Sequence, residues 1–184
     1  MQGADLGPAE TIIIGPSRGA FSGIAVDRVL LWAPMSSPLG ETKPSSRDMR
    51  NRLQSPGRFS YVAMTGDHDA DQAAILKQTP NGAGEDVYND WTPSWVDKSP
   101  YLLAGVQSLK KRGRVILSGE TMSQDIGVPY QLVVGRGLRM LGSLMSSRDT
   151  VRKAVQMVEQ GMLRWEVGER GVSLFAGPTS RGPC

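Results

Sequence analysis

The chain has 184 residues, of which 39% are hydrophobic and 21% charged, and its formal net charge is +3. This length suits one domain with its own core, and the hydrophobic content excludes a wholly disordered chain. Lysine and arginine are spread along the sequence without forming a basic stripe, which argues against nucleic-acid binding. No apolar run reaches the roughly 18–20 residues of a membrane-spanning helix, and residues 1–8 do not resemble a secretory signal. We therefore expect a cytoplasmic protein that does not bind membranes.

Cysteine and histidine each occur once, as Cys184 and His68. A single cysteine cannot form a disulfide within the chain, so nothing indicates an oxidising compartment. A catalytic zinc ion usually takes three protein ligands from cysteine, histidine and carboxylate side chains. His68 lies between two aspartates in what we predict to be a solvated loop, so we do not expect zinc in this chain.

Short apolar runs alternate with stretches of helical periodicity in the first half of the chain. The β-branched run TIIIG at Thr11–Gly15 predicts a buried strand, and apolar residues at helical spacing follow over residues 19–31. Residues 60–65 (SYVAMT) predict a further strand. Asp69 is the expected N-cap of the next helix, which covers residues 73–76 and ends before Pro80 and Gly82.

The same alternation continues in the second half. Strands are predicted at residues 86–91 (DVYNDW), 114–118 (RVILS) and 138–143 (LRMLGS). Ser99 and Pro100 predict the start of a helix that ends near Gly113. A last amphipathic helix is predicted over residues 149–160. Strands that alternate with helices predict an α/β fold, a doubly wound parallel sheet of the Rossmann type.

Residues 32–46 (WAPMSSPLGETKPSS) interrupt this pattern with three prolines and no apolar run. The alternation requires a second strand near here, but this segment is predicted to be an irregular, mobile loop, which leaves the second-strand region incomplete. The expected organisation is an N-terminal stub at residues 1–9, one nucleotide-binding domain at residues 10–175, and a disordered tail at residues 176–184.

The turn after the first strand, residues 15–23 (GPSRGAFSG), is the candidate phosphate-binding loop. Glycines permit close approach of backbone N–H groups to a pyrophosphate, and a helix N-terminus adds a positive dipole end. Arg18 can add a charge-assisted contact. A glycine-rich turn without a ligand, in any α/β protein, remains the alternative.

Four segments together resemble the cofactor domain of the medium-chain dehydrogenase/reductase family, and most closely its zinc-type alcohol dehydrogenases. They are residues 10–27 (ETIIIGPSRGAFSGIAVD), 60–75 (SYVAMTGDHDADQAAI), 108–120 (SLKKRGRVILSGE) and 138–163 (LRMLGSLMSSRDTVRKAVQMVEQGML). The resemblance extends over residues 10–175. It implies a Rossmann domain that binds NAD or NADP and takes part in hydride transfer between the nicotinamide and a small alcohol or carbonyl substrate.

The resemblance also implies a set of cofactor-binding residues. They are Ser17, Arg18, Gly19, Ala20 and Phe21 in the phosphate loop, Arg47 after the second strand, and Ser118 and Gly119 after a later strand. Gly19 matches the middle glycine of the family's motif, whereas Pro16 and Ser22 stand where the family has its flanking glycines. Arg47 would favour the 2′-phosphate of NADP. In the family the loops at residues 90–92, 118–120 and 143–145 approach the nicotinamide side, mostly through backbone groups.

The family's zinc ligands and proton relay lie mainly on an N-terminal catalytic domain, which this sequence is expected to lack, so the catalytic residues stay unassigned. Two functions therefore remain open: a dehydrogenase-like oxidoreductase, or a non-catalytic nucleotide-binding or dimerisation module, including an inactive truncated fragment. A short-chain reductase is disfavoured, because none of the four tyrosines is followed four residues later by lysine. The family also implies a homodimer formed through the late strand at residues 138–143.

Overall fold

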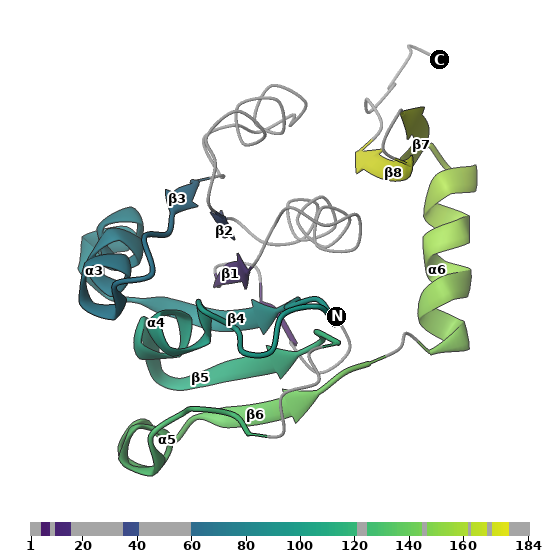
Figure 1. The fold of residues 1–184 in the computed structure, drawn as a ribbon. Coiled ribbons are helices and arrows are strands. Elements are labelled where there is room, and N and C mark those ends of the chain that lie inside the picture. Colours follow the sequence, from purple (N-terminus) through teal and green to yellow (C-terminus); the bar gives the residue numbers. More distant parts are fainter. Residues whose placement is uncertain are drawn as a thin grey trace.

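The computed structural model describes residues 5–7, 10–15, 35–40, 60–120, 125–144, 147–161, 163–168 and 171–176, with only the backbone for 35–40, 163–168 and 171–176. Its centre is a six-stranded sheet with the strand order β3-β2-β1-β4-β5-β6, in which every neighbouring pair is parallel. The first strand, β1, lies in the middle of this sheet, with β2 and β3 on one side of it and β4, β5 and β6 on the other (Figure 1). The predicted Rossmann-type α/β fold is confirmed.

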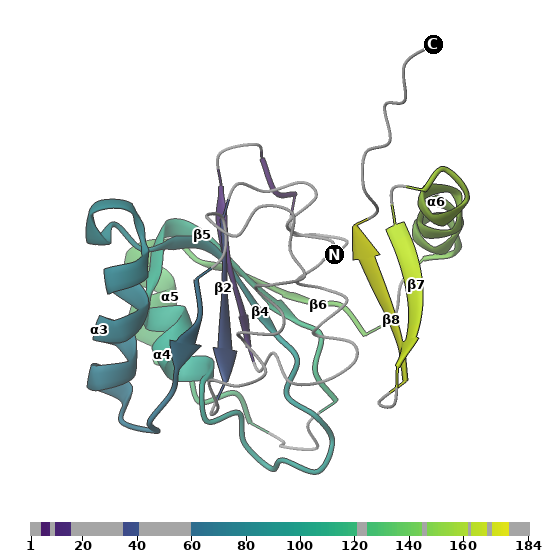
Figure 2. The same ribbon diagram turned by 90° about the horizontal axis from the view of Figure 1, so that it is seen from above.

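The elements follow one another in a regular alternation. The sheet strands are β1 (Thr11–Gly15), β2 (Met35–Gly40), β3 (Val62–Ala63), β4 (Glu85–Asp90), β5 (Leu109–Leu117) and β6 (Arg139–Gly142). The helices are α3 (His68–Gln78), η2 (Pro80–Gly82), α4 (Leu102–Gln107), α5 (Tyr130–Arg136) and α6 (Arg148–Glu159). Helices α3, α4 and α5 share one face of the sheet (Figure 2). None of the helices described is long and apolar enough to cross a membrane.

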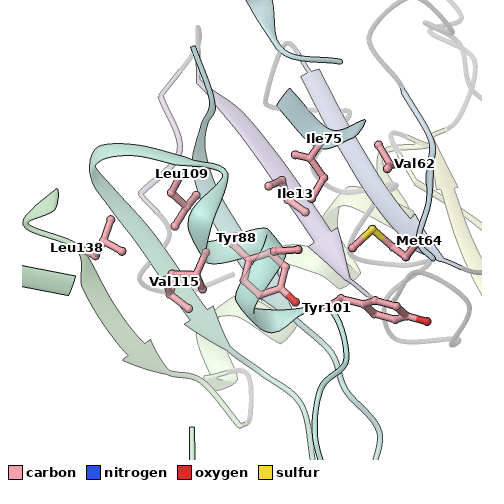
Figure 3. Packing of buried hydrophobic residues seen from close by; sticks show 11 residues of the cluster. Ile13, Val62, Met64, Ile75, Tyr88, Tyr101, Leu109, Val115 and Leu138 are labelled. Atoms are coloured by element: carbon pink, nitrogen blue, oxygen red, sulfur yellow. The ribbon is translucent and has the colours of Figure 1, made fainter. Parts of the chain in front are cut away.

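The main core lies between the sheet and helices α3, α4 and α5. Alternate strand residues such as Ile13, Tyr88 and Val115 belong to one buried cluster, with the Tyr88 ring at its centre (Figure 3). Burying one such side chain contributes roughly 1.5–3 kcal/mol. Ile12 and Ile116, which point to the other face, are also fully buried. Burial on both faces explains why β1 is a continuous apolar run instead of an alternating one.

The prediction for residues 32–46 is wrong at its centre, because Met35–Gly40 forms strand β2. This strand pairs with β1 from Thr11↔Met35 to Ile14↔Pro38, and with β3 only at Leu39 and Gly40. Pairing with an apolar central neighbour decides strand formation here, against the low β propensity of the segment. The other residues of the 32–46 segment lie outside the described part of the chain.

Two predicted helix boundaries also differ from the structure. Asp67, and not Asp69, caps α3, and its carboxylate accepts hydrogen bonds from the backbone N–H groups of Asp69 (3.0 Å) and Ala70 (2.9 Å). His68 is therefore an exposed residue at the start of a helix, where the prediction was a loop. Gly113 does not end a helix; it lies within β5, because α4 already ends at Gln107.

The C-terminal elements follow after β6. Helix α6 agrees with the prediction for residues 149–160, and the Ser147 hydroxyl caps it by accepting from the N–H of Thr150 (3.2 Å). Strands β7 (Leu163–Gly168) and β8 (Gly171–Ala176) pair in an antiparallel hairpin separate from the main sheet. Residue 176, predicted to begin the tail, therefore belongs to β8, and residues 177–184 lie outside the described part.

Candidate dinucleotide-binding site

The candidate site lies at the edge of the sheet where the strands end, here called the crest. The strand order reverses between β1 and β4, the position at which open α/β sheets bind ligands. At this point Gly15 pairs with Asp90, and the backbone N–H of Trp91 donates to the Gly15 carbonyl (2.6 Å). The end of β1 and the first residue after β4 are therefore held side by side.

Only part of the predicted cofactor set falls on described residues. Ser17, Arg18, Gly19, Ala20, Phe21 and Arg47 lie outside them, as do Pro16 and Ser22. Ser118 and Gly119 follow directly after β5, and the Ser118 N–H donates to the carbonyl of Asp90 (2.9 Å). The structure therefore brings Ser118 and Gly119 to the crest, next to the end of β4.

Asp90, the last residue of β4, is 4% exposed, and its carboxylate accepts four hydrogen bonds. Oδ1 accepts from the hydroxyl groups of Tyr88 (3.0 Å), Thr92 (2.9 Å) and Ser99 (2.9 Å). Oδ2 accepts from the backbone N–H of Thr92 (3.1 Å). A buried carboxylate requires such donors to offset its lost hydration. Sequence reasoning placed residues 90–92 near the cofactor but missed the role of this carboxylate, whose only sequence signal is an acid flanked by hydroxyl residues two positions away on each side.

The burial of the Tyr88 ring and the neighbouring Asp90 carboxylate raise the pKa of the Tyr88 phenol well above its usual value. The hydroxyl group therefore stays protonated at neutral pH and keeps donating to Asp90. Ser99, predicted as a helix N-cap, donates to the same carboxylate, and α4 has no side-chain cap. Tyr88 and Ser99 therefore both donate hydrogen bonds to Asp90, in what is here called the Asp90 cluster (Tyr88, Asp90, Thr92 and Ser99).

Gly119 lies where the segments after β4 and β5 touch. A Cβ atom at this position would lie 2.5 Å from the Thr92 carbonyl oxygen and 2.9 Å from Asp90 Oδ2. The Glu120 N–H donates to the same Thr92 carbonyl (2.8 Å). Glycine is thus required for the two segments to approach this closely.

Within the described part of the chain, two buried polar atoms near the end of β4 have no hydrogen-bond partner: Asn89 Oδ1, an acceptor, and Trp91 Nε1, a donor. Asn89 lies in β4 and Trp91 directly follows it, so the two residues flank Asp90 beside the end of β1. Unsatisfied buried polar atoms are costly and frequent at ligand sites, and a ribose or amide group could satisfy both. The crest thus fits a dinucleotide. No group of three or more metal-ligating side chains occurs among the described residues.

Comparison with known proteins identifies the fold. No family model and no curated protein sequence matches the chain. Among solved structures, AibC has a TM-score of 0.75 at 17% identity, with 94% of this chain and 50% of that chain covered. An NAD-dependent alcohol dehydrogenase has a TM-score of 0.67 at 20% identity, with 94% and 52% covered. The crotonyl-CoA carboxylase/reductase AntE in complex with NADP has a TM-score of 0.65 at 16% identity, with 88% and 43% covered.

The chain thus has the fold found in these solved structures, two of which are a dehydrogenase and a reductase, as its resemblance to the medium-chain dehydrogenase/reductase family implied. It spans about half the length of the solved structures that it matches (50%, 43% and 52%). At 16–20% identity the likeness carries the fold, and the site has to be argued from its own residues.

Proposed function

We propose that the chain binds NAD or NADP across its crest and serves an oxidoreductase that moves hydride between the nicotinamide and a small alcohol or carbonyl substrate. The observation that carries the proposal is the reversal of strand order at β1 and β4, with Ser118 and Gly119 beside it. AntE was solved with NADP and another structural neighbour is NAD-dependent, which supports a nicotinamide cofactor. The absence of an intrachain disulfide suits the cytoplasm.

The bound cofactor would supply the hydride chemistry, and the residues of this chain would bind and orient it. The phosphate loop, with Ser17, Arg18, Gly19, Ala20 and Phe21, would hold the pyrophosphate, and Arg47 would favour the 2′-phosphate of NADP. Ser118 and Gly119 would meet the nicotinamide half. Asp90 is not assigned a catalytic role, because its side chain is buried and its carboxylate accepts four hydrogen bonds from within the chain. No residue of this chain is assigned to activation of the substrate oxygen, which would need another domain or subunit.

Calorimetric titration of the purified chain with NADPH and NADH tests the binding. We expect saturable heat for at least one of them, and a strong loss in Gly119→Ala, whose new Cβ would meet the Thr92 carbonyl oxygen at 2.5 Å. Gly135→Ala in α5 is the matched control, since a Cβ there meets nothing within 4 Å. No heat with either cofactor would refute the proposal.

The second candidate function is a non-catalytic module that binds the nucleotide or dimerises. It is favoured by exposed apolar side chains on β6, the last strand in the sheet order, and on the preceding helix α5. They are Leu141 (38%) in β6, and Val134 (58%) and Tyr130 (77%) in α5. An exposed strand edge with apolar neighbours can pair with the same edge of a second copy. Light scattering should give a dimer for the wild type and a monomer for Leu141→Lys. A monomeric wild type would exclude the homodimer.

A further inference from the structure

The Asp90 carboxylate closes the segment after β4 into a ring. Thr92, at the start of the segment, donates its N–H and its hydroxyl to this carboxylate, and Ser99, seven residues later, donates its hydroxyl to the same oxygen as the Thr92 hydroxyl. The segment of residues 91–99, here called the β4 loop, is therefore held near both of its ends by the same buried carboxylate. Without the carboxylate neither end has this anchor.

Thr92 also links the β4 loop to the residues that follow the next strand, β5. Its carbonyl oxygen accepts the N–H of Glu120 (2.8 Å), so the residues after β5, here called the β5 loop (residues 118–120), rest on the β4 loop. Gly119 lies so near to Thr92 and Asp90 that a Cβ atom there would come within 2.5 Å of the Thr92 carbonyl oxygen and 2.9 Å of Asp90 Oδ2. A shift of Thr92 toward the β5 loop should therefore move Gly119 as well, because the space between them does not admit even a methyl group.

We propose that Asp90 is a positioning residue for the dinucleotide: its carboxylate sets the place of the β4 loop, and through Thr92 the place of Ser118 and Gly119 at the crest. This inference rests on the proposed function. Asp90 is not placed to contact the cofactor itself, since its side chain is buried and its carboxylate already accepts four hydrogen bonds from within the chain. It acts by keeping the surface that faces the nicotinamide half in one arrangement before the cofactor arrives.

Asp86, on the same strand, provides a matched control. Its Oδ2 accepts from Thr11 N (2.9 Å), Thr11 Oγ1 (3.0 Å) and Lys110 Nζ (2.9 Å). Like Asp90 it is a carboxylate that collects several donors, but it lies near the opposite end of β4 and bonds to neither crest loop. Loss of Asp86 should lower stability without altering the crest.

The experiment compares Asp90→Asn with Asp86→Asn in the full chain, measuring the Kd for NADPH and NADH by fluorescence titration. In Asp90→Asn an amide N–H group must replace one of the accepting oxygens. At the Oδ2 position the amide nitrogen would face the backbone N–H of Thr92, donor against donor. At the Oδ1 position it would remove the acceptor that three hydroxyl groups share. We expect the Kd to rise about tenfold in Asp90→Asn, as loss of a charge-assisted hydrogen-bond cluster warrants, and to change less than about twofold in Asp86→Asn. Equal changes in both variants, or none in Asp90→Asn, would overturn the inference.

Hydrogen exchange without cofactor separates this inference from the proposed function. The Glu120 amide should exchange faster in Asp90→Asn than in the wild type or in Asp86→Asn. Unchanged exchange at Glu120 overturns the positioning role, whereas failure of the wild type to bind either cofactor overturns the proposed function. If Asp90→Asn does not fold, Thr92→Val removes one hydroxyl bond and keeps the side-chain shape. It should change exchange and Kd in the same direction by a smaller factor, and no change in either would equally refute the role.

Discussion

The contact between Gly105 and Tyr88 offers a direct test of how the core supports the crest. Gly105 lies in α4, and a Cβ atom there would lie 2.5 Å from Cε2, 2.6 Å from Cδ2 and 3.0 Å from Cζ of Tyr88. The ring cannot easily retreat, because Tyr88 is fully buried and its hydroxyl is bonded to Asp90 at 3.0 Å. Gly105→Ala should therefore overpack the core and disturb the Asp90 cluster.

Two opposing effects set the expected size of this change. Overpacking a tight core costs about 1–3 kcal/mol, whereas replacing glycine by alanine inside a helix gains about 0.5–1 kcal/mol. The net result for Gly105→Ala is a loss of up to about 2.5 kcal/mol of unfolding free energy, and the close approach to three ring atoms puts it toward the upper end. Gly135→Ala, in a helix with no atom within 4 Å of the new Cβ, should show only the gain.

Urea denaturation followed by circular dichroism measures both variants on one scale. The two alanine substitutions should shift the midpoint in opposite directions. Equal stabilisation by both would mean that the Tyr88 ring has room to move, and would refute the packing argument. A destabilised Gly105→Ala should also bind cofactor more weakly, because displacement of the ring withdraws a donor from Asp90.

Three further predictions concern a carboxylate, a helix cap and the cofactor phosphate. Burial raises the pKa of Asp86, but the hydrogen bond and charge of Lys110 and the hydrogen bonds from Thr11 outweigh burial and hold the pKa below its usual 3.8. In urea melts, wild type should therefore be more stable than Asp86→Asn at pH 6, and this difference should vanish as the pH falls below 3.8. Asp67→Ala removes the cap of α3 and should cost about 1 kcal/mol in the same melts, whereas the exposed His68→Ala should cost less. Arg47→Ala should weaken NADPH binding about tenfold and leave NADH binding unchanged in a fluorescence titration; equal effects on both would refute the assignment of Arg47 to the 2′-phosphate.

The pattern of apolar residues along the sequence predicted those helices and strands whose buried side chains are themselves apolar. The run TIIIG of β1 is apolar because both faces of the strand are covered, and that is visible in the sequence itself. Strand β2 was missed because its pairing with β1, and not its composition, decides its conformation. Helix α5 was missed because it has no side-chain cap and leaves Tyr130 and Val134 exposed, so it shows little amphipathic contrast.

The same distinction applies to the site. The position of Ser118 and Gly119 after β5 could be predicted because they follow an apolar strand in a segment that resembles a known family, whereas their contact with a cofactor stays a prediction. The role of Asp90 could not, because a single acid after an apolar run occurs in many strands without any function. Its significance depends on Ser99 returning to it and on Gly119 packing against it, and both contacts arise only when the chain is folded.

Strand β4 has Asp86 near its start and Asp90 at its end. The first is expected to contribute to stability alone, and the second to the arrangement of the crest. Asp86 ties the start of β1 to β5 through Thr11 and Lys110, contacts that any sheet of this kind could replace with apolar packing. Asp90 occupies the one place where the strand order reverses, and no apolar side chain could hold Thr92 and Ser99 at once. A buried charge is a costly way to fix a loop. Its use at the crest is explained if the arrangement of Ser118 and Gly119 matters more than the stability that an apolar residue at this position would provide.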